Sequence, residues 1–274
     1  MGSDAQEFCT LMPGLFDRYW CSQYDAFSFF NFMQNTTALL NVVCKNATDQ
    51  KVDFVIPPAL EKAIQNSTRI NSPDTSEYPW PPPVDDSWTG WMDITIDNLI
   101  NEVNISSGEQ EFVGPLFSAL GRGLIVNGHR RVLGHRLFRH RPDHWTFMIR
   151  DHSSSDLDEN YLLRSEILGI TSILYRQMNE VCWDAWKHTY MQPRLTYQHG
   201  QLTATIVTFM VGKVRVFEAT CDPSDQNPTL TCTLRGFYDL SMSCYNKSSV
   251  HEIVKWILCP PGLTQGVLLR HKKA

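Results

Sequence analysis

The hydrophobic and polar positions of the C-terminal half follow a helical spacing first and a strand-like spacing afterwards. Between residues 159 and 186, apolar side chains recur at helical intervals, which predicts one long amphipathic helix. Four segments then alternate apolar and polar residues as strands do, namely 194–198, 201–210, 213–221 and 229–240. Glycine-containing turns at 199–200 and 211–212 join the first three, so we expect antiparallel neighbours. A helical pattern over 249–259 predicts a closing helix.

The N-terminal half shows mainly helical spacing, interrupted at 66–91 by a segment rich in proline and tryptophan. The predicted helices span 7–20, 25–43, 57–65, 91–103 and 109–126, and a short strand is predicted at 145–150. We therefore expect one α+β domain over residues 1–274, with a mainly helical layer at 1–126. Residues 145–260 would form an antiparallel sheet of about four to five strands packed on the long helix.

Composition narrows the class of protein. The chain has 274 residues, of which 42% are hydrophobic and 19% charged, so it can bury a sizeable core. Its formal net charge of −5 disfavours binding to nucleic acid or to an anionic membrane surface. No apolar run approaches the roughly 18 residues that span a bilayer, and residues 1–6 lack the basic start of a signal peptide. From these features we expect a cytoplasmic protein.

Cysteine usage agrees with a reducing compartment. The eight cysteines are scattered and form no CxxC pair, so we expect free thiols rather than a disulfide framework. Five N-x-S/T sequons also occur, and without a secretion signal they are interpreted as chance matches. The sequons begin at Asn35, Asn46, Asn66, Asn104 and Asn246.

Two carboxylates are predicted to lie on apolar faces. Glu166 falls inside the hydrophobic arc of the helix at 159–186, and Glu218 alternates in step with Val214 and Val216 on a strand. A carboxyl group in an apolar site has a raised pKa and can act as a general acid or base near neutral pH. We therefore name Glu166 and Glu218 as candidate catalytic residues.

The alternative for each carboxylate is a purely structural ion pair. Glu166, for example, would pair with an arginine such as Arg194 or Arg215 and fix the sheet against the helix.

The proline- and tryptophan-rich segment allows two interpretations. Its prolines make it stiff and unable to join a sheet, which is typical of a linker that crosses the surface. Long loops inside a domain are often functional, however, so it could instead be a lid over a pocket. In that case Trp80, Trp88 and Trp91 would line the substrate site.

A basic segment at 129–144 contains five arginines and four histidines. The histidines form no HExxH motif, and no helix is predicted over this segment that would place a pair of them on one helical face, so we do not expect a metal site. Binding of nucleic acid by this segment is disfavoured, because no aromatic stacking motif is interleaved with its basic residues. Two interpretations of the segment remain. It is a solvated basic strand or loop, or its arginines recognise an anionic small molecule. For that last alternative the candidate substrate-binding residues are Arg122, His129, Arg130 and, less directly, Arg131.

Residues 161–259 resemble a large family of mostly uncharacterised proteins from filamentous fungi. The similar elements are "YLLRSEILGI", "ATIVTFMVGKVRVFEATCD", "TLRGFYDLS" and "IVKWILC". The resemblance implies a fungal cytosolic protein with no agreed activity. Among fungal proteins of this type are cofactor-free cyclases and isomerases, such as the hydroalkoxylating cyclase of phenalenone biosynthesis.

A helix followed by a hairpin also looks like the core of PD-(D/E)xK nucleases. The chain departs from that pattern, because Glu218 is followed by Ala219 and Thr220 and no lysine stands two positions on. Metal-dependent nuclease activity is therefore not expected.

The sequence thus favours a cofactor-independent cyclase or isomerase that uses general acid/base catalysis. Its substrate would be a hydrophobic or aromatic intermediate of a fungal polyketide or terpenoid pathway, and we expect neither a cofactor nor a metal. The alternative is a non-catalytic binding module, and the assembly state, including a homo-oligomer, stays open. An enclosed aromatic cavity reached by Glu166, Glu218 or an arginine would favour the enzyme, and a filled core with an exposed apolar patch the binding module.

Overall fold

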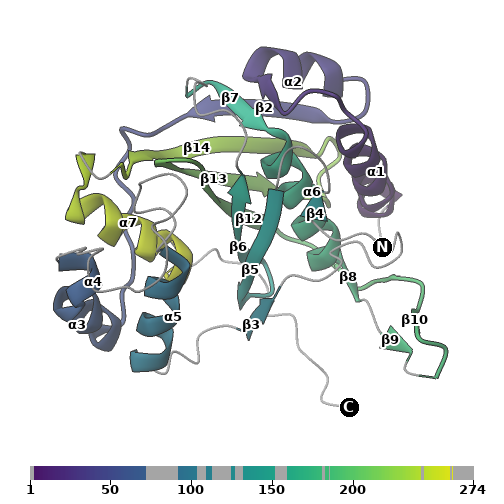
Figure 1. The fold of residues 1–274 in the computed structure, drawn as a ribbon. Helices are drawn as coiled ribbons and strands as arrows, with labels where there is room; N and C mark the ends of the chain where they lie inside the picture. The colour runs from purple at the N-terminus through teal and green to yellow at the C-terminus, as the bar shows by residue number, and fades with distance from the viewer. Residues whose placement is uncertain are drawn as a thin grey trace.

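A mixed β-sheet with helices on both of its faces forms the centre of the computed structural model (Figure 1). The α+β class expected from the sequence is confirmed. The structure describes residues 3–71, 92–103, 109–112, 125–126, 132–151, 159–180, 183–184, 186–241, 244–259 and 261. The statements below concern these residues.

The main sheet differs from the predicted one in size and direction. Its long strands are β2 (Asn41–Asn46), β5 (Val132–Arg141), β6 (His144–Asp151), β12 (Leu202–Phe209), β13 (Lys213–Cys221) and β14 (Thr229–Asp239). Two short strands, β3 (Glu109–Phe112) and β4 (Ile125–Val126), pair with β5. The order is β2-β14-β13-β12-β6-β5-β3. Two neighbouring pairs, β6 with β12 and β2 with β14, are parallel.

The prediction of four to five antiparallel strands was therefore wrong. Helix α6 (Arg164–Met178) follows β6 and precedes β12, so the chain crosses one face of the sheet between two parallel strands. Such a crossover returns the chain in the same direction, which a hairpin cannot do. Strand β2 comes from the N-terminal half, where the sequence pattern had indicated a helix.

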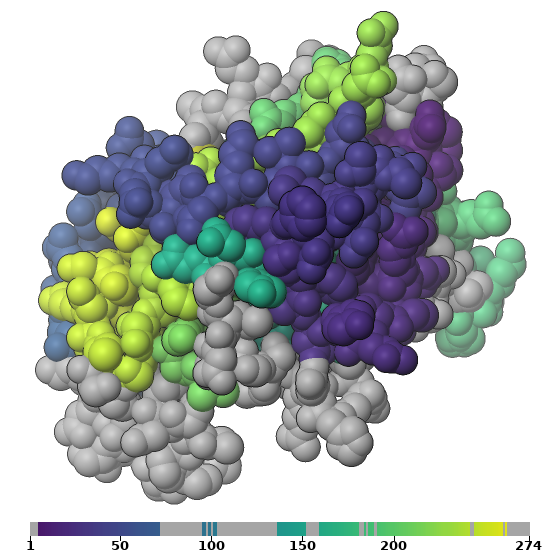
Figure 2. All heavy atoms as spheres, turned by 90° about the horizontal axis from the view of Figure 1, so that it is seen from above, coloured from purple at the N-terminus to yellow at the C-terminus, as the bar shows by residue number. Residues whose placement is uncertain are grey.

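Helices cover the two faces in separate groups. On one face α6 packs beside α1 (Ser3–Trp20). On the other face lie α7 (Lys247–Leu258), α3 (Pro58–Asn66), α4 (Thr68–Asn71) and α5 (Met92–Val103) (Figure 1). Seen from above, purple to blue N-terminal segments form much of the surface beside the yellow α7 (Figure 2).

Two of the predicted helices, at 25–43 and 109–126, were wrong. The segment 25–43 is not one helix but β1 (Ala26–Ser28), α2 (Phe29–Thr36) and the start of β2. Ser28 breaks it because its Oγ accepts a hydrogen bond from the Asn31 N–H at 3.1 Å and so caps α2. The predicted helix at 109–126 contains β3 and β4 in its described parts.

The predicted helix at 159–186 is shorter than expected. It is preceded by β7 (Tyr161–Leu163), which pairs with β1, and followed by β8 (Asn179–Glu180). Strand β11 (Arg194–Leu195) pairs with β8 rather than with β12, so the first predicted hairpin was wrong. The short strands β9 (Trp183–Asp184) and β10 (Thr189–Tyr190) pair with each other. The second hairpin, β12 with β13, was confirmed, and Gly212 adopts φ +68° in its turn.

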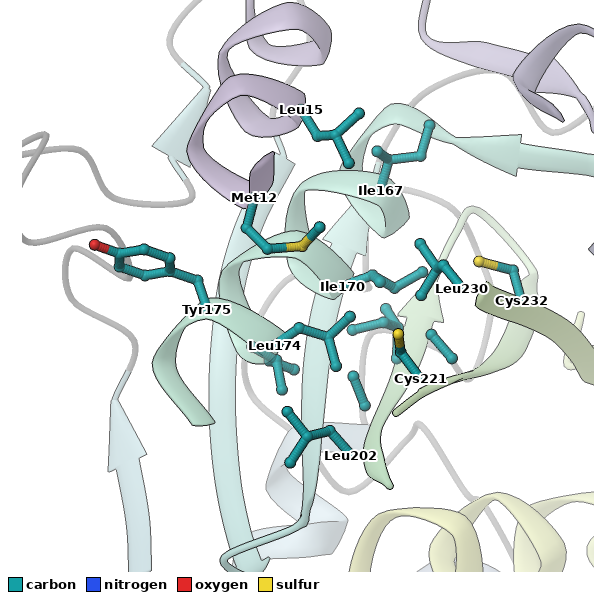
Figure 3. Close-up of a cluster of buried hydrophobic side chains, with 14 of the residues drawn as sticks. Met12, Leu15, Ile167, Ile170, Leu174, Tyr175, Leu202, Cys221, Leu230 and Cys232 are labelled. Carbon is teal, nitrogen blue, oxygen red and sulfur yellow. The ribbon is translucent and has the colours of Figure 1, made fainter. Parts of the chain in front are cut away.

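Two hydrophobic clusters hold these layers together. The first lies between α1, α6 and the sheet, where Met12 and Leu15 of α1 face Ile170 of α6 and Leu230 of β14 (Figure 3). The second lies between α7, the shorter helices and the opposite face, and it includes Trp256. Burial of both faces explains why β6, β12 and β13 are nearly continuous runs of buried residues.

Candidate functional site

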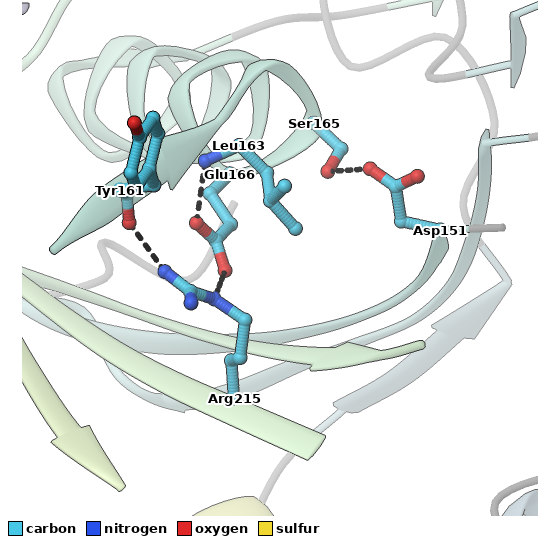
Figure 4. Close-up of polar contacts among 6 residues, drawn as sticks. All are labelled: Asp151, Tyr161, Leu163, Ser165, Glu166 and Arg215. Carbon is cyan, nitrogen blue, oxygen red and sulfur yellow. Dashed lines mark hydrogen bonds and ion pairs between the residues drawn. The ribbon is translucent and has the colours of Figure 1, made fainter. Parts of the chain in front are cut away.

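Glu166 is fully buried in an ion pair that joins α6 to β13. Its Oε2 accepts a hydrogen bond from the Leu163 N–H at 2.8 Å, which caps the first turn of α6. Its Oε1 lies 3.1 Å from Arg215 Nε, and both side chains have 0% exposure. Arg215 also donates to the carbonyl oxygen of Tyr161 (Figure 4). Its guanidinium lies 5.1 Å from the ring centroid of Phe217.

This geometry favours the structural alternative for Glu166. Burial raises the pKa of the Glu166 carboxyl, and the Arg215 charge and the Leu163 N–H oppose that rise. Both of its oxygens already accept a hydrogen bond from a neighbour. A cavity of about 10 Å³ does open nearby between α1, α6 and β14, but it is apolar and has room for about one water molecule. Arg194, the other partner considered, pairs with Glu180 instead.

Glu218 lies on the opposite face of the sheet, the face that α7 covers. Val214 and Val216 share this face, as the strand period predicts, and belong to the second hydrophobic cluster. Glu218 is 9% exposed, and its Oε1 accepts hydrogen bonds from Arg235 Nη2 at 2.7 Å and Nε at 3.2 Å. The expectation that Glu218 is mostly buried and has a hydrogen-bond partner is confirmed. Both bonds fall on one oxygen, which leaves Oε2 available as an acceptor.

Glu218 is part of a row of polar side chains that crosses four neighbouring strands. Thr146 on β6 pairs with Thr205 on β12, which pairs with Glu218 on β13, which pairs with Thr233 on β14. We call these residues the polar row. Thr146 and Thr205 are 0% exposed, and Thr233 is 6% exposed. The hydroxyl of Thr146 is buried and has no hydrogen-bond partner, which is uncommon for a buried polar group.

His144 orients the hydroxyl of Thr205. Its Nδ1 lies 3.0 Å from Arg141 Nη2, and its Nε2 lies 2.9 Å from Thr205 Oγ1. Because arginine can only donate, Nδ1 must accept, and the ring proton therefore stands on Nε2. Burial first, and then the Arg141 and His140 charges, hold the pKa of His144 well below its usual range, so the ring is neutral. Nε2–H donates to Thr205, whose own proton is then free to point at another acceptor.

The polar row places hydrogen-bond donors and an acceptor side by side. Adjacent strands are about 4.8 Å apart, so side chains in register lie side by side. The row offers a hydroxyl donor at Thr205, an unpartnered hydroxyl at Thr146 and a carboxylate oxygen at Glu218. A donor beside a carboxylate is what proton transfer next to a carbonyl group requires.

Most of the other candidates named from the sequence lie outside the described residues. These are Trp80, Trp88, Trp91, Arg122, His129, Arg130 and Arg131. The basic segment is described only from residue 132 onward, where it forms β5 and the start of β6. Interpreting it as solvated was wrong for Arg136 and His144, which are 3% and 1% exposed.

Sequence reasoning missed Thr146, Thr205, His144 and Arg235 as neighbours of Glu218. Threonine is an ordinary strand residue, so it gave no signal of its own. The spacing of Thr203 and Thr205 was the available clue, because residues two apart put their hydroxyls on one face of a strand. The pairing of β6 with β12, however, could be seen only in the fold.

No model of a protein family, curated protein or solved structure matches the chain.

Within the described residues, no group of three or more histidine, cysteine, aspartate or glutamate side chains could hold a metal ion. In the same part of the chain, no helix combines the length and apolar character needed to cross a membrane. Cys182 lies outside the described residues, and the other cysteines are free thiols.

Proposed function

We propose that the protein is a cofactor-independent isomerase or cyclase whose acid/base centre is the polar row around Glu218. The observation that carries the proposal is the row formed by the buried carboxylate of Glu218, its register partner Thr205 and, on the next strand, Thr146, whose buried hydroxyl has no partner. Its substrate class is an aromatic polyketide or terpenoid intermediate that bears a carbonyl or phenol group. The resemblance to fungal proteins described above suggests this class of substrate.

Each residue has a separate part in the proposed reaction. The substrate carbonyl oxygen accepts a hydrogen bond from Thr205, whose proton His144 directs away from the ring. Glu218 removes a proton from the carbon next to that carbonyl, and Thr146 supplies a second donor to the enolate that forms. Return of the proton at another carbon completes an isomerisation. In a cyclisation, Glu218 instead takes the proton of a substrate hydroxyl, that oxygen adds to the β-carbon of the enone while its C=C bond breaks to give the enolate, and the proton returns to the carbon next to the carbonyl. Neither outcome changes the composition of the substrate.

Arg235 holds Glu218 in place between proton transfers, because its Nε and Nη2 both donate to Oε1. The same contacts favour a second candidate function, a non-catalytic binding module, because they fix Glu218 as a hydrogen-bond acceptor. In that case the polar row would hold a ligand through the same hydrogen bonds without changing it.

The test is an incubation of the purified protein with phenol-bearing enone intermediates in deuterated water. A new chromatographic peak of unchanged composition that carries deuterium is expected, and EDTA should leave its rate unaffected. Glu218→Gln keeps the shape but removes the base, so turnover should fall by about 100-fold or more. Glu180→Gln, which removes an exposed carboxylate that pairs with Arg194, is the matched control and should keep full activity.

The outcomes separate the two functions. Full activity in Glu218→Gln would exclude the proposed base. Binding of the intermediates without turnover or deuterium exchange, weakened by both Glu218→Gln and Thr146→Val, would support the binding module instead.

A further inference from the structure

Two cysteines from distant parts of the chain lie opposite each other on adjacent strands. Cys44 on β2 is the register partner of Cys232 on β14, and these strands run parallel. Side chains in register lie on the same face of a sheet. Here that is the α6 face, because Cys232 belongs to the first hydrophobic cluster and Cys44 packs against it.

The side chain of Cys44 influences that of Cys232. A hydrogen bond between the two thiols, and then burial, raise the pKa of Cys232 well above its usual range. Cys232 is 0% exposed and lies beside Leu230 in the core (Figure 3). Cys44 is half-buried, so one member of the pair can meet a small reagent while the other waits behind it.

The strand geometry also suits a bond between them. Adjacent strands are about 4.8 Å apart, and disulfides form between Cα atoms about 4.4–6.8 Å apart. The bridged Cβ atoms must come closer than parallel strands usually hold them, so one strand has to shift slightly. Strand β2 stands at the end of the strand order and has β14 as its neighbour in the sheet, so a shift of β2 disturbs fewer strand pairings than a shift of β14.

We propose that Cys44 and Cys232 form a redox modification site at which hydrogen peroxide or a similar peroxide makes a reversible disulfide. The Cys44 thiolate attacks the peroxide, an S–O bond forms and the O–O bond breaks, and one water leaves after protonation. Cys232 then attacks the Cys44 sulfur, the S–S bond forms, the S–O bond breaks, and its thiol proton leaves with the hydroxyl as a second water. Two thiols are oxidised and one peroxide is reduced. A dithiol reductant reverses the change.

The site does not depend on the proposed function, because both cysteines face α6 while Glu218 faces α7. The expected consequence of the disulfide is a change in the stability of the protein. The bond would tie β2 to β14 and close a long loop of chain, which constrains the unfolded state and should make the oxidised protein harder to unfold.

The test treats the purified protein with hydrogen peroxide, denatures it with a maleimide present and counts the remaining thiols. The wild type should lose two thiols and regain them with dithiothreitol. In the Cys44→Ser variant, the thiol of Cys232 should remain free after the same treatment. Cys21→Ser is the matched control, because Cys21 lies on the same tryptic peptide, 19–45, and should not alter the loss.

Mass spectrometry then identifies the bridge. Cys232 shares the tryptic peptide 216–235 with Cys221, so Cys221→Ser should still give a cross-link between peptides 19–45 and 216–235. Cys232→Ala should abolish it, and if that variant unfolds, the Cys44→Ser result decides alone. Equal loss of thiols in wild type and Cys44→Ser would overturn the proposal. So would a cross-link that survives Cys44→Ser or vanishes in Cys221→Ser.

Discussion

Substitution of Glu166 by glutamine should destabilise the protein strongly although it changes few atoms. Glutamine can still accept the hydrogen bond from the Leu163 N–H, so the cap on α6 survives. What disappears is the negative charge 3.1 Å from Arg215, whose side chain is 0% exposed. The variant therefore leaves the buried Arg215 charge without the Glu166 carboxylate, while Arg215 still donates to the Tyr161 carbonyl and lies near the rings of Phe217 and Phe237.

The magnitude follows from the burial of both partners. Breaking a fully buried ion pair on one side typically costs about 3–5 kcal/mol. For a chain of this size, each kcal/mol shifts Tm by roughly 2–4 °C, so a loss near 10 °C is expected. The double variant Glu166→Gln with Arg215→Met removes both charges of the pair, and it should recover about 2 kcal/mol or more relative to the sum of the single variants.

Urea and thermal unfolding of the single and double variants measure these effects. Glu218→Gln on the same strand as Arg215 is the control, because Arg235 is 24% exposed and can be solvated. Its cost should stay below about 2 kcal/mol. If Glu166→Gln proves as mild as Glu218→Gln, or if the double variant is merely additive, the pair is not the structural link inferred here.

Two further predictions concern pH and packing. The pKa of His144 in the folded protein is held well below the unfolded value of about 6.5. As the pH drops below about 6.5, the unfolded chain therefore binds the proton first, and the free energy of unfolding should fall by up to ~1.4 kcal/mol per pH unit. Urea midpoints between about pH 5 and pH 7.5 should show this slope, and His144→Gln should flatten it; an unchanged slope would contradict a neutral buried ring. Gly169→Ala would place a Cβ 3.0 Å from Ile206 Cδ1 and 3.1 Å from Ile149 Cδ1, so it should destabilise by about 1 kcal/mol or more. Gly14→Ala, with nothing within 4 Å, should raise Tm, and equal effects at both positions would refute the packing argument.

The elements that the sequence predicted well are those whose signals are local. The hairpin of β12 and β13 combines alternation with a glycine that adopts positive φ, and α7 combines helical spacing with the side chain of Asn246 as its cap. Strand direction is not a local property. The pairing of β6 with β12 depends on where α6 returns the chain, and that of β2 with β14 joins segments far apart in sequence.

The same distinction applies to the candidate site. The period of a strand placed Glu218 on a buried face, and Arg215 was among the partners considered for Glu166. The neighbours of Glu218 could not be foreseen, because Thr146 and Thr205 meet only through the unforeseen parallel pairing. Periodicity is enough to predict whether a single residue is buried. Predicting which residues from different strands lie next to one another requires the order of the strands as well.

Burial alone does not identify a reactive carboxylate, and the two faces of β13 show why. Glu166 is the more buried of the two, yet both of its oxygens are occupied by donors, so a substrate would have to displace a helix cap or an ion pair. Glu218 is slightly exposed, keeps one oxygen available and belongs to the polar row, in which the hydroxyl of Thr146 lacks a partner. Unsatisfied hydrogen-bonding capacity in a buried place is costly unless something else satisfies it. That imbalance, rather than the depth of the charge, makes the face of Glu218 the one to test for a ligand.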